Sequence, residues 1–309
     1  DSGQVAVGYK ALQDADAATG TAANVAVGYE ALKVCTTGTT NTALGYQALL
    51  ACLTGSGNIA IGKDALIALT DGASNVAIGV DSGTAITTGD QNVFVGSGAG
   101  YATQDVDKAV CIGYDAGLGI MTSAADGTVA IGYEALNDLT TGARNIAIGQ
   151  GAADKLTVGD DNIAIGIDAL GSMATTDGND KNLAIGQYAL ANAGGSSNVA
   201  SANVCVGYSA GVQVTTGDHN VLIGMNSGVA INTGVRNICI GTGAGEVITA
   251  GDECISIGYD SDCASDIQEA IAIGTFAIAS ADNAICIGAN ITNSAANDFA
   301  FVRFSPRLA

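Results

Sequence analysis

The chain has 309 residues and a formal net charge of −20, from 30 acidic against 10 basic residues. This charge disfavours phosphate backbones and anionic membranes as partners, so we expect neither nucleic-acid binding nor membrane insertion. No run of about 20 apolar residues, the length that spans a bilayer, is present. With 44 glycines that do not recur at every third position and a single proline, the chain is not collagen-like either.

One motif, asparagine-aliphatic-alanine-aliphatic-glycine, recurs through the sequence up to residue 288. The commonest step between its closing glycines is 17 residues, with steps of 19 to 21 at four places and of 16 and 14 at the end. A fixed period with few insertions predicts a solenoid of stacked parallel coils. The closing glycines are Gly8, Gly28, Gly45, Gly62, Gly79, Gly96, Gly113, Gly132, Gly149, Gly166, Gly186, Gly207, Gly224, Gly241, Gly258, Gly274 and Gly288.

Each copy predicts one β-strand that ends at the glycine. The residues three and one before it, such as Ile146 and Ile148, are aliphatic and share one face, and the small residue between them, such as Ala147, points to the other. Because both faces are apolar, we expect the middle strip to pack against the same strip of sister chains in a homotrimer. Arginine at Ala147 is then expected to break the trimer, and arginine at Ile148 to prevent the coil from forming. The predicted trimer-interface residues are Ala26, Ala60, Ala77, Cys111, Ala130, Ala147, Ala164, Cys205, Cys239 and Cys286.

A second recurring stretch follows the glycine, as in Tyr29, Ala31 and Leu32. We expect it to form a second, outer strand, which a turn of the Thr-Thr-Gly type then ends. The asparagine four residues before the glycine, such as Asn58, has two interpretations. Either its amide stacks on equivalent amides as a ladder, or asparagine simply suits the turn that enters the strand.

The repeat defines a solenoid over residues 1–296. Residues 297–309 hold three of the five phenylalanines and the only proline, which predicts a C-terminal cap or junction, with a receptor-binding tip as the alternative. The four longer steps place extra residues in the polar turn, near 14–19, 118–126, 173–180 and 193–202, where loops would project from one edge. The candidate receptor loops are marked by Asp16, Asp126, Asp177, Asp180 and Ser197.

Motifs for catalysis are missing from the sequence. The single histidine, His219, lies in a polar turn without a partner pattern for metal binding or a hydrolytic triad, so we expect no enzyme and no cofactor. No metal ligand is assigned, although acidic turns at 105–107, 177–180, 251–253 and 260–266 leave calcium open.

Cysteine replaces alanine at the middle strand position in four copies. Such residues act as small apolar side chains, so we expect Cys111, Cys205, Cys239 and Cys286 to be buried free thiols. A secreted disulfide protein would instead pair its cysteines at loop spacings. The cysteine pattern therefore favours folding in a reducing cytoplasm over export.

The pattern NVAIG-Y-x-A-L, over residues 4 to about 292, resembles the head repeats of YadA-like trimeric autotransporter adhesins. It is also similar to related repeats in tail fibres and spikes of phages and other viruses. The resemblance implies an all-β fold, a left-handed parallel β-roll (β-solenoid) of about 17 coils with a 17-residue period, assembled as a homotrimer.

Together these observations predict a non-enzymatic structural fibre protein on the virion surface, part of a viral or phage tail fibre or spike that presents a host-attachment surface. Its partners would be two further copies of itself, further fibre or adhesin segments, and a host receptor that the sequence does not name. The alternative is an adhesin head on a bacterial cell surface that binds host matrix or cells. A third hypothesis, an ice-binding solenoid, is suggested by the threonine-rich turns, although many coils lack the threonine.

Overall fold

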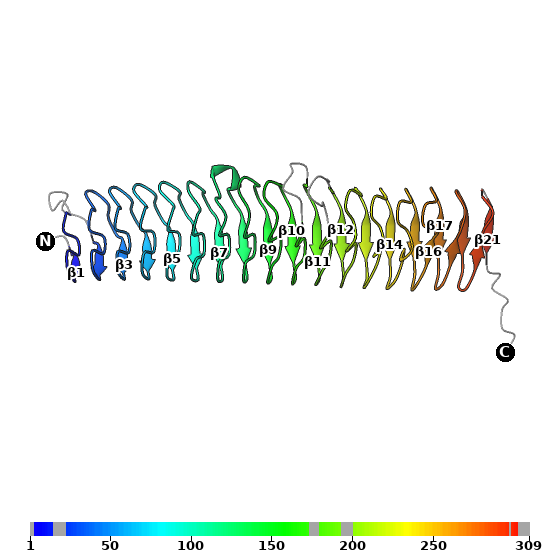
Figure 1. Ribbon diagram of the computed structural model, residues 1–309, viewed down its shortest axis with the longest axis horizontal. Coiled ribbons are helices and arrows are strands. Elements are labelled where there is room, and N and C mark those ends of the chain that lie inside the picture. The colour runs from blue at the N-terminus through cyan, green and yellow to red at the C-terminus, as the bar shows by residue number, and fades with distance from the viewer. Residues whose placement is uncertain (1–2, 15–22, 173–178, 193–199, 297, 302–309) are drawn as a thin grey trace. The chain divides into compact units, whose positions relative to one another are not determined.

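The computed structural model describes residues 3–14, 23–172, 179–192, 200–296 and 298–301. Two compact units are present, Asp1–Asp161 and Asn162–Ala309. Each is a parallel β-solenoid in which a short strand recurs once per coil (Figure 1). The expected all-β solenoid with a period of about 17 residues is therefore confirmed, with about 16 turns against the 17 expected.

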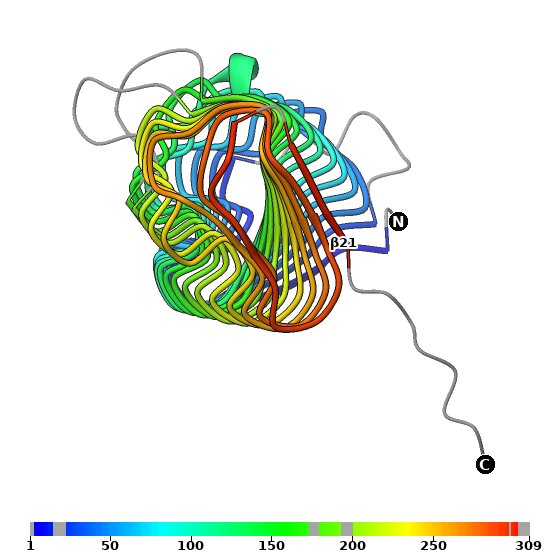
Figure 2. The ribbon, with the colours of Figure 1, turned by 90° about the vertical axis from the view of Figure 1, so that its right-hand side faces the viewer.

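The described part of the first unit contains one parallel sheet. Neighbouring strands pair in register, residue on equivalent residue, as in Val25 with Thr42 and Ala26 with Ala43. Seen end-on, each coil makes one turn around the core (Figure 2). A 3-10 helix, η2 (Ser123–Ala125), lies in one of the longer coils. The strands are β1 (Val5–Val7), β2 (Val25–Val27), β3 (Thr42–Leu44), β4 (Ile59–Ile61), β5 (Val76–Ile78), β6 (Val93–Val95), β7 (Val110–Ile112), β8 (Val129–Ile131) and β9 (Ile146–Ile148).

The second unit continues the same pattern and adds a second sheet in its last coils. The main sheet holds β10 (Ile163–Ile165), β11 (Leu183–Ile185), β12 (Val204–Val206), β13 (Val221–Ile223), β14 (Ile238–Ile240), β15 (Ile255–Ile257), β17 (Ile271–Ile273), β19 (Ile285–Ile287) and β21 (Phe299–Phe301). The smaller sheet holds β16 (Asp262–Cys263), β18 (Ile278–Ala279) and β20 (Thr292–Asn293). Because β21 pairs in register with β19, the strand ladder runs into the segment predicted as a cap. Residues 297 and 302–309 of that segment lie outside the described residues.

The predicted second strand is wrong for the 17-residue coils. The stretch after the glycine is a series of turns in which the second and fourth residues have positive φ, such as Glu30 at 52° and Leu32 at 48°. Their amides still bond the neighbouring coils, Glu30 N to Tyr9 O at 2.8 Å and Leu32 N to Ala48 O at 2.9 Å. Alternating left-handed residues bend the chain around the core while the hydrogen bonds between coils are kept.

Two columns of interior residues compensate each other in volume. One is the middle strand residue, and the other is the fourth residue after the closing glycine. Where the first is alanine the second is often leucine, as in Ala60 and Leu66, both fully buried. Where the first is larger the second is glycine: a Cβ on Gly100 would lie 2.5 Å from Cδ1 of Phe94. In coils such as these the core is thus filled by one large side chain, from one column or the other, and the coil of Ala77 and Gly83 is filled by Leu66 and Phe94 of its neighbours.

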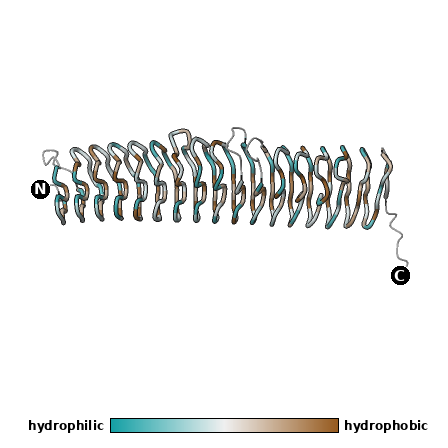
Figure 3. The backbone as a smooth tube through the Cα atoms, viewed as in Figure 1, coloured by the Kyte–Doolittle hydropathy of each residue, from teal (hydrophilic) through white to brown (hydrophobic). Residues whose placement is uncertain are grey.

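The closing glycines form a column of their own. Gly62 has φ of 139°, and a Cβ there would lie 2.2 Å from the carbonyl oxygen of Gly79 in the next coil. Both the backbone conformation and the closeness of the neighbouring coil therefore require glycine. The apolar stretch before each of these corners recurs coil after coil in Figure 3.

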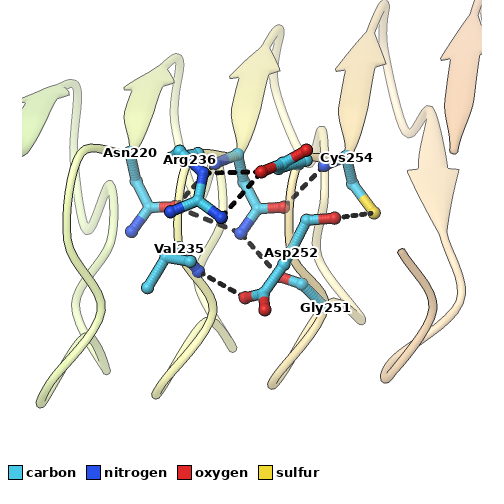
Figure 4. Close-up of polar contacts among 8 residues, drawn as sticks. Asn220, Val235, Arg236, Gly251, Asp252 and Cys254 are labelled. Atoms are coloured by element: carbon cyan, nitrogen blue, oxygen red, sulfur yellow. Dashed lines mark hydrogen bonds and ion pairs between the residues drawn. The ribbon is translucent and has the colours of Figure 1, made fainter. Parts of the chain in front are cut away.

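The asparagines form the predicted ladder and make a further contact. Nδ2 of Asn237 donates to Oδ1 of Asn220 at 3.1 Å and to the carbonyl of Gly251, in the turn of the next coil, at 2.7 Å (Figure 4). The carboxylate of Asp252, in the same turn as Gly251, accepts the amide of Val235 in the turn one coil earlier at 2.9 Å. An asparagine such as Asn237 therefore ties its strand to a turn as well as to a neighbouring asparagine.

Candidate interaction surface

The two faces of the strand are the reverse of the sequence prediction. The middle residues point into the coil's own core, and all ten predicted trimer-interface residues have 0% exposure in the single chain: Ala26, Ala60, Ala77, Cys111, Ala130, Ala147, Ala164, Cys205, Cys239 and Cys286. Such side chains present no surface to a sister chain, so that assignment is wrong. The reason is the volume compensation described above, since alanine makes room for the leucine of its own coil.

The flanking aliphatic residues instead form the outer face of the sheet. In the first unit Leu44 is 46% exposed and Ile78 is 38% exposed, and in the second Ile223 and Ile240 are each 37% exposed. Because the strands pair in register, these side chains form continuous columns along each unit. This contiguous apolar strip is the candidate interaction surface of each unit.

A column of aromatic residues borders this face at the position after the closing glycine. Tyr9, Tyr29 and Tyr46 stack at centroid distances of 5.2 and 5.0 Å, and Tyr114 stacks on Tyr133 at 5.6 Å. All five rings are exposed. The exposed apolar surface therefore extends from the strand around its corner.

Acidic and basic side chains accompany the tyrosines. Glu30 accepts a hydrogen bond from Gln47 at 2.9 Å and pairs with Lys33 at 2.9 Å, and these two bonds, the first more than the second, lower the pKa of its carboxyl. Among the described residues, no lysine or arginine pairs with Asp115, and burial first, then the nearby charge of Glu134, raise the pKa of its carboxyl. The charge balance along the column thus differs from one step to the next.

An unusual carboxylate lies where the coils shorten in the second unit. Oδ2 of Asp262 accepts the amide of Val247 at 3.0 Å, a bond that a backbone carbonyl makes in earlier coils, as between Val34 and Leu50. Oδ1 of Asp262 is buried and has no hydrogen-bond partner. Burial, with smaller contributions from Glu246 and Asp260, raises the pKa of this carboxyl to about 7.

Only part of the predicted receptor loops lies within the described residues. Asp16, Asp177 and Ser197 fall outside them. Asp126 follows η2 and its Oδ1 accepts the amide of Asp107 at 2.8 Å, so its carboxylate ties two coils together. Asp180 is half-buried, and its carbonyl accepts the amide of Ala202 at 2.9 Å. Neither described aspartate is a freely projecting contact residue.

The insertion at 118–126 projects from its unit but is anchored in the core. Met121 and Ala125 in this segment are fully buried, while η2 stands out beyond the neighbouring coils (Figure 2). This longer step therefore gives a projection at the edge, as predicted, whose base packs into the core.

All eight cysteines are free and buried, which confirms the expectation for Cys111, Cys205, Cys239 and Cys286. Burial raises the pKa of Cys111 to about 12, and raises those of Cys205 and Cys239 as well. A thiol with a raised pKa stays protonated and unreactive at neutral pH. These residues therefore act in packing.

The turns show no chemistry beyond structure in the part of the chain that is described. Hydroxyls of the threonine-rich turns donate to carbonyls of the next coil, as Thr36 does to Leu53 at 3.0 Å and Thr140 to Thr157 at 2.9 Å. Threonine hydroxyls used in this way are not presented as the flat array that ice binding needs. No three acidic, cysteine or histidine side chains are grouped to hold a metal ion within the described ranges.

Neither a protein-family model nor a curated protein matches the sequence. Within the described residues, no helix has the length and apolar character needed to cross a bilayer.

Proposed function

We propose that the chain is a structural fibre protein without enzymatic activity, a segment of a viral or phage tail fibre or spike on the virion surface. In this proposal it assembles as a homotrimeric left-handed β-roll, joins further fibre segments and presents a host-attachment surface. The observation that carries the proposal is the outer aliphatic face, which repeats along each unit and is exposed in the single chain.

A repeated apolar face supports self-association for a geometric reason. The columns of Leu44, Ile59 and Ile78 repeat with the strand spacing of about 4.8 Å, so a sister chain brings an equal spacing to the same surface. Monomeric proteins rarely leave a contiguous apolar strip of this kind in water. The number of three chains comes from the resemblance of the repeat to trimeric heads and fibres.

The contacts between coils support a structural role. In the described coils, backbone hydrogen bonds join neighbours, and many coils add the asparagine ladder and a carboxylate that accepts a turn amide, such as Asp90 from Ala73 at 2.6 Å. The stability of such a stack is a sum of contributions from each coil and from its contacts with its neighbours. Added coils therefore lengthen the stack without requiring a separate hydrophobic core. This is the property that a fibre needs.

The cysteines favour a fibre assembled inside a host cell over the alternative of an exported adhesin head. Eight free, buried thiols fit a protein that folds in a reducing compartment. Labelling of the native and the denatured protein with a thiol reagent tests this step. Disulfides among them would move the proposal toward the adhesin head.

The assembly is tested with a pair of neighbouring arginine substitutions. Ile148→Arg places a charge on the outer face, where Ile148 is 37% exposed, and is expected to weaken the trimer while each chain keeps its β-sheet spectrum. Ala147→Arg places the charge in the core and is expected to unfold the coils around it. Sedimentation velocity with circular dichroism separates the two effects. A trimer that is unchanged by Ile148→Arg would argue against assembly through this face.

A further inference from the structure

Two tyrosine stacks in the first unit differ in how their neighbouring carboxylates are balanced. At the stack that begins with Tyr9, the chain supplies its own cations: Nζ of Lys10 lies 5.3 Å from the Tyr9 ring centroid, and Lys33 pairs with Glu30. At that stack, lysines of the chain itself therefore contact the Tyr9 ring and neutralise the nearby carboxylate of Glu30.

At the second stack, Tyr114 and Tyr133 are 54% and 48% exposed and lie nearly parallel, at an interplanar angle of 10°. The residues that follow them are Asp115 and Glu134, and neither carboxylate pairs with a lysine or arginine in the described part of the chain. Like charges on adjacent coils repel each other, so a cation arriving between them would be favoured.

The tyrosine column is also interrupted on both sides of this stack. The equivalent position is Ser97 in the preceding coil and Gln150 in the following one, and both are exposed. The outer faces of the two rings therefore meet no further ring of the column. A guanidinium or ammonium group binds to such a face by cation–π attraction, which adds to the attraction of the carboxylates.

We propose that Tyr114, Tyr133, Asp115 and Glu134 form a docking site for an arginine or lysine side chain of a partner protein. Charge complementarity identifies this occupant, because two carboxylates that no lysine or arginine of the described residues pairs with lie beside two exposed rings. The proposal names the kind of side chain that a partner protein would bring to this site. It depends neither on the fibre assignment nor on the number of chains in the assembly.

The test is calorimetric titration of the full chain with triarginine amide, with tricitrulline amide as the neutral isostere, in about 0.15 M salt to screen long-range attraction. The double variant Tyr114→Leu with Tyr133→Leu keeps the charge and is expected to weaken triarginine binding about 3-fold. Asp115→Asn with Glu134→Gln is expected to weaken it about 5-fold. Tricitrulline is expected not to bind.

Two matched controls distinguish this site from general attraction to an acidic protein. Tyr29→Leu with Tyr46→Leu alters the stack that has its own cations, and Asp71→Asn with Asp105→Asn removes two negative charges elsewhere. Both are expected to leave the affinity unchanged. Controls that weaken binding as much as the site variants would overturn the proposal, as would full affinity in the Tyr114 and Tyr133 double variant. Circular dichroism and mass of each variant show whether fold and assembly are intact, so failure here is separate from failure of the proposed assembly.

Discussion

The middle strand residue and the fourth residue after the closing glycine compensate each other in side-chain volume. This compensation can be tested at Leu222 and Gly228, which occupy the two positions in one coil. Leu222 is fully buried, and a Cβ on Gly228, whose φ is 58°, would lie 2.6 Å from Cδ2 of Leu222. In another coil of the same unit, Ala164 and Leu170 occupy the same two positions, with Leu170 at a φ of 54°. The double variant Leu222→Ala with Gly228→Leu thus installs a combination that the fold already uses.

The single variants are expected to fail for opposite reasons. Leu222→Ala leaves a cavity and should cost about 2 to 5 kcal/mol of unfolding free energy. Gly228→Leu overpacks the coil, at about 1 to 3 kcal/mol, and adds about 1 to 2 kcal/mol for leucine at positive φ. The double variant should be more stable than the sum of the two losses by about 1 to 3 kcal/mol. Recovery is incomplete, because Leu222 also fills space beside Gly211.

Urea unfolding followed by circular dichroism measures the four proteins of this cycle. A coupling energy near zero would refute the argument that these two core positions compensate each other in volume. Self-association is monitored in parallel, so that a loss of assembly is not counted as a loss of packing.

Three further outcomes are expected. Asn75→Asp puts a carboxylate where Nδ2 donates to the carbonyl of Gly89 at 2.8 Å, and should lower the unfolding free energy by about 3 to 5 kcal/mol; an unchanged urea midpoint at pH 7 would contradict the ladder. Asp262 has a raised pKa of about 7, so its stabilising contribution is complete below about pH 4 and is lost as the pH rises through 7. Asp262→Asn should therefore raise the urea midpoint at pH 8 and flatten its dependence on pH between 4 and 8, and an unaltered pH profile would contradict this. Gly62→Ala, at a φ of 139° and with no room for a Cβ, should cost at least about 3 kcal/mol, and a thermal midpoint equal to that of the unmodified protein would exclude the tight corner.

The periodicity was sufficient to predict the strands, the corners and the parallel stacking. A glycine that closes each copy and aliphatic residues two apart locate a strand such as Ile59–Ile61 within one or two residues. In-register pairing follows from the fixed period, since equivalent residues must meet when coils stack. The asparagine ladder, one of two interpretations, was also available from the sequence.

The faces of the strand were not predicted, because alternation shows which residues share a face but not which face is inside. Here both faces are apolar, as in Ile146, Ala147 and Ile148. The sequence does hold a signal that settles the question. In one coil the middle strand residue Cys205 is followed by Gly211 at the fourth position after the closing glycine, whereas in another coil Ala60 is followed by Leu66 at that position. Compensating volumes at two positions of one coil indicate that both lie in the same core.

The turns after the glycine were mistaken for a strand because leucine rarely adopts positive φ. Leu32, Leu49 and Leu66 do so here because the buried side chain offsets the cost of the strained backbone. The signal that was missed is the glycine at the same position in other coils, such as Gly83 and Gly100. Where leucine and glycine alternate at one repeat position, a left-handed conformation explains both.

The mass of the unmodified chain in solution tests the proposed assembly most directly. Multi-angle light scattering is expected to give three times the chain mass of 30.2 kDa, about 91 kDa, over a range of protein concentrations. A stable species of 30.2 kDa with the native circular dichroism spectrum would contradict the proposal that the outer aliphatic face joins sister chains.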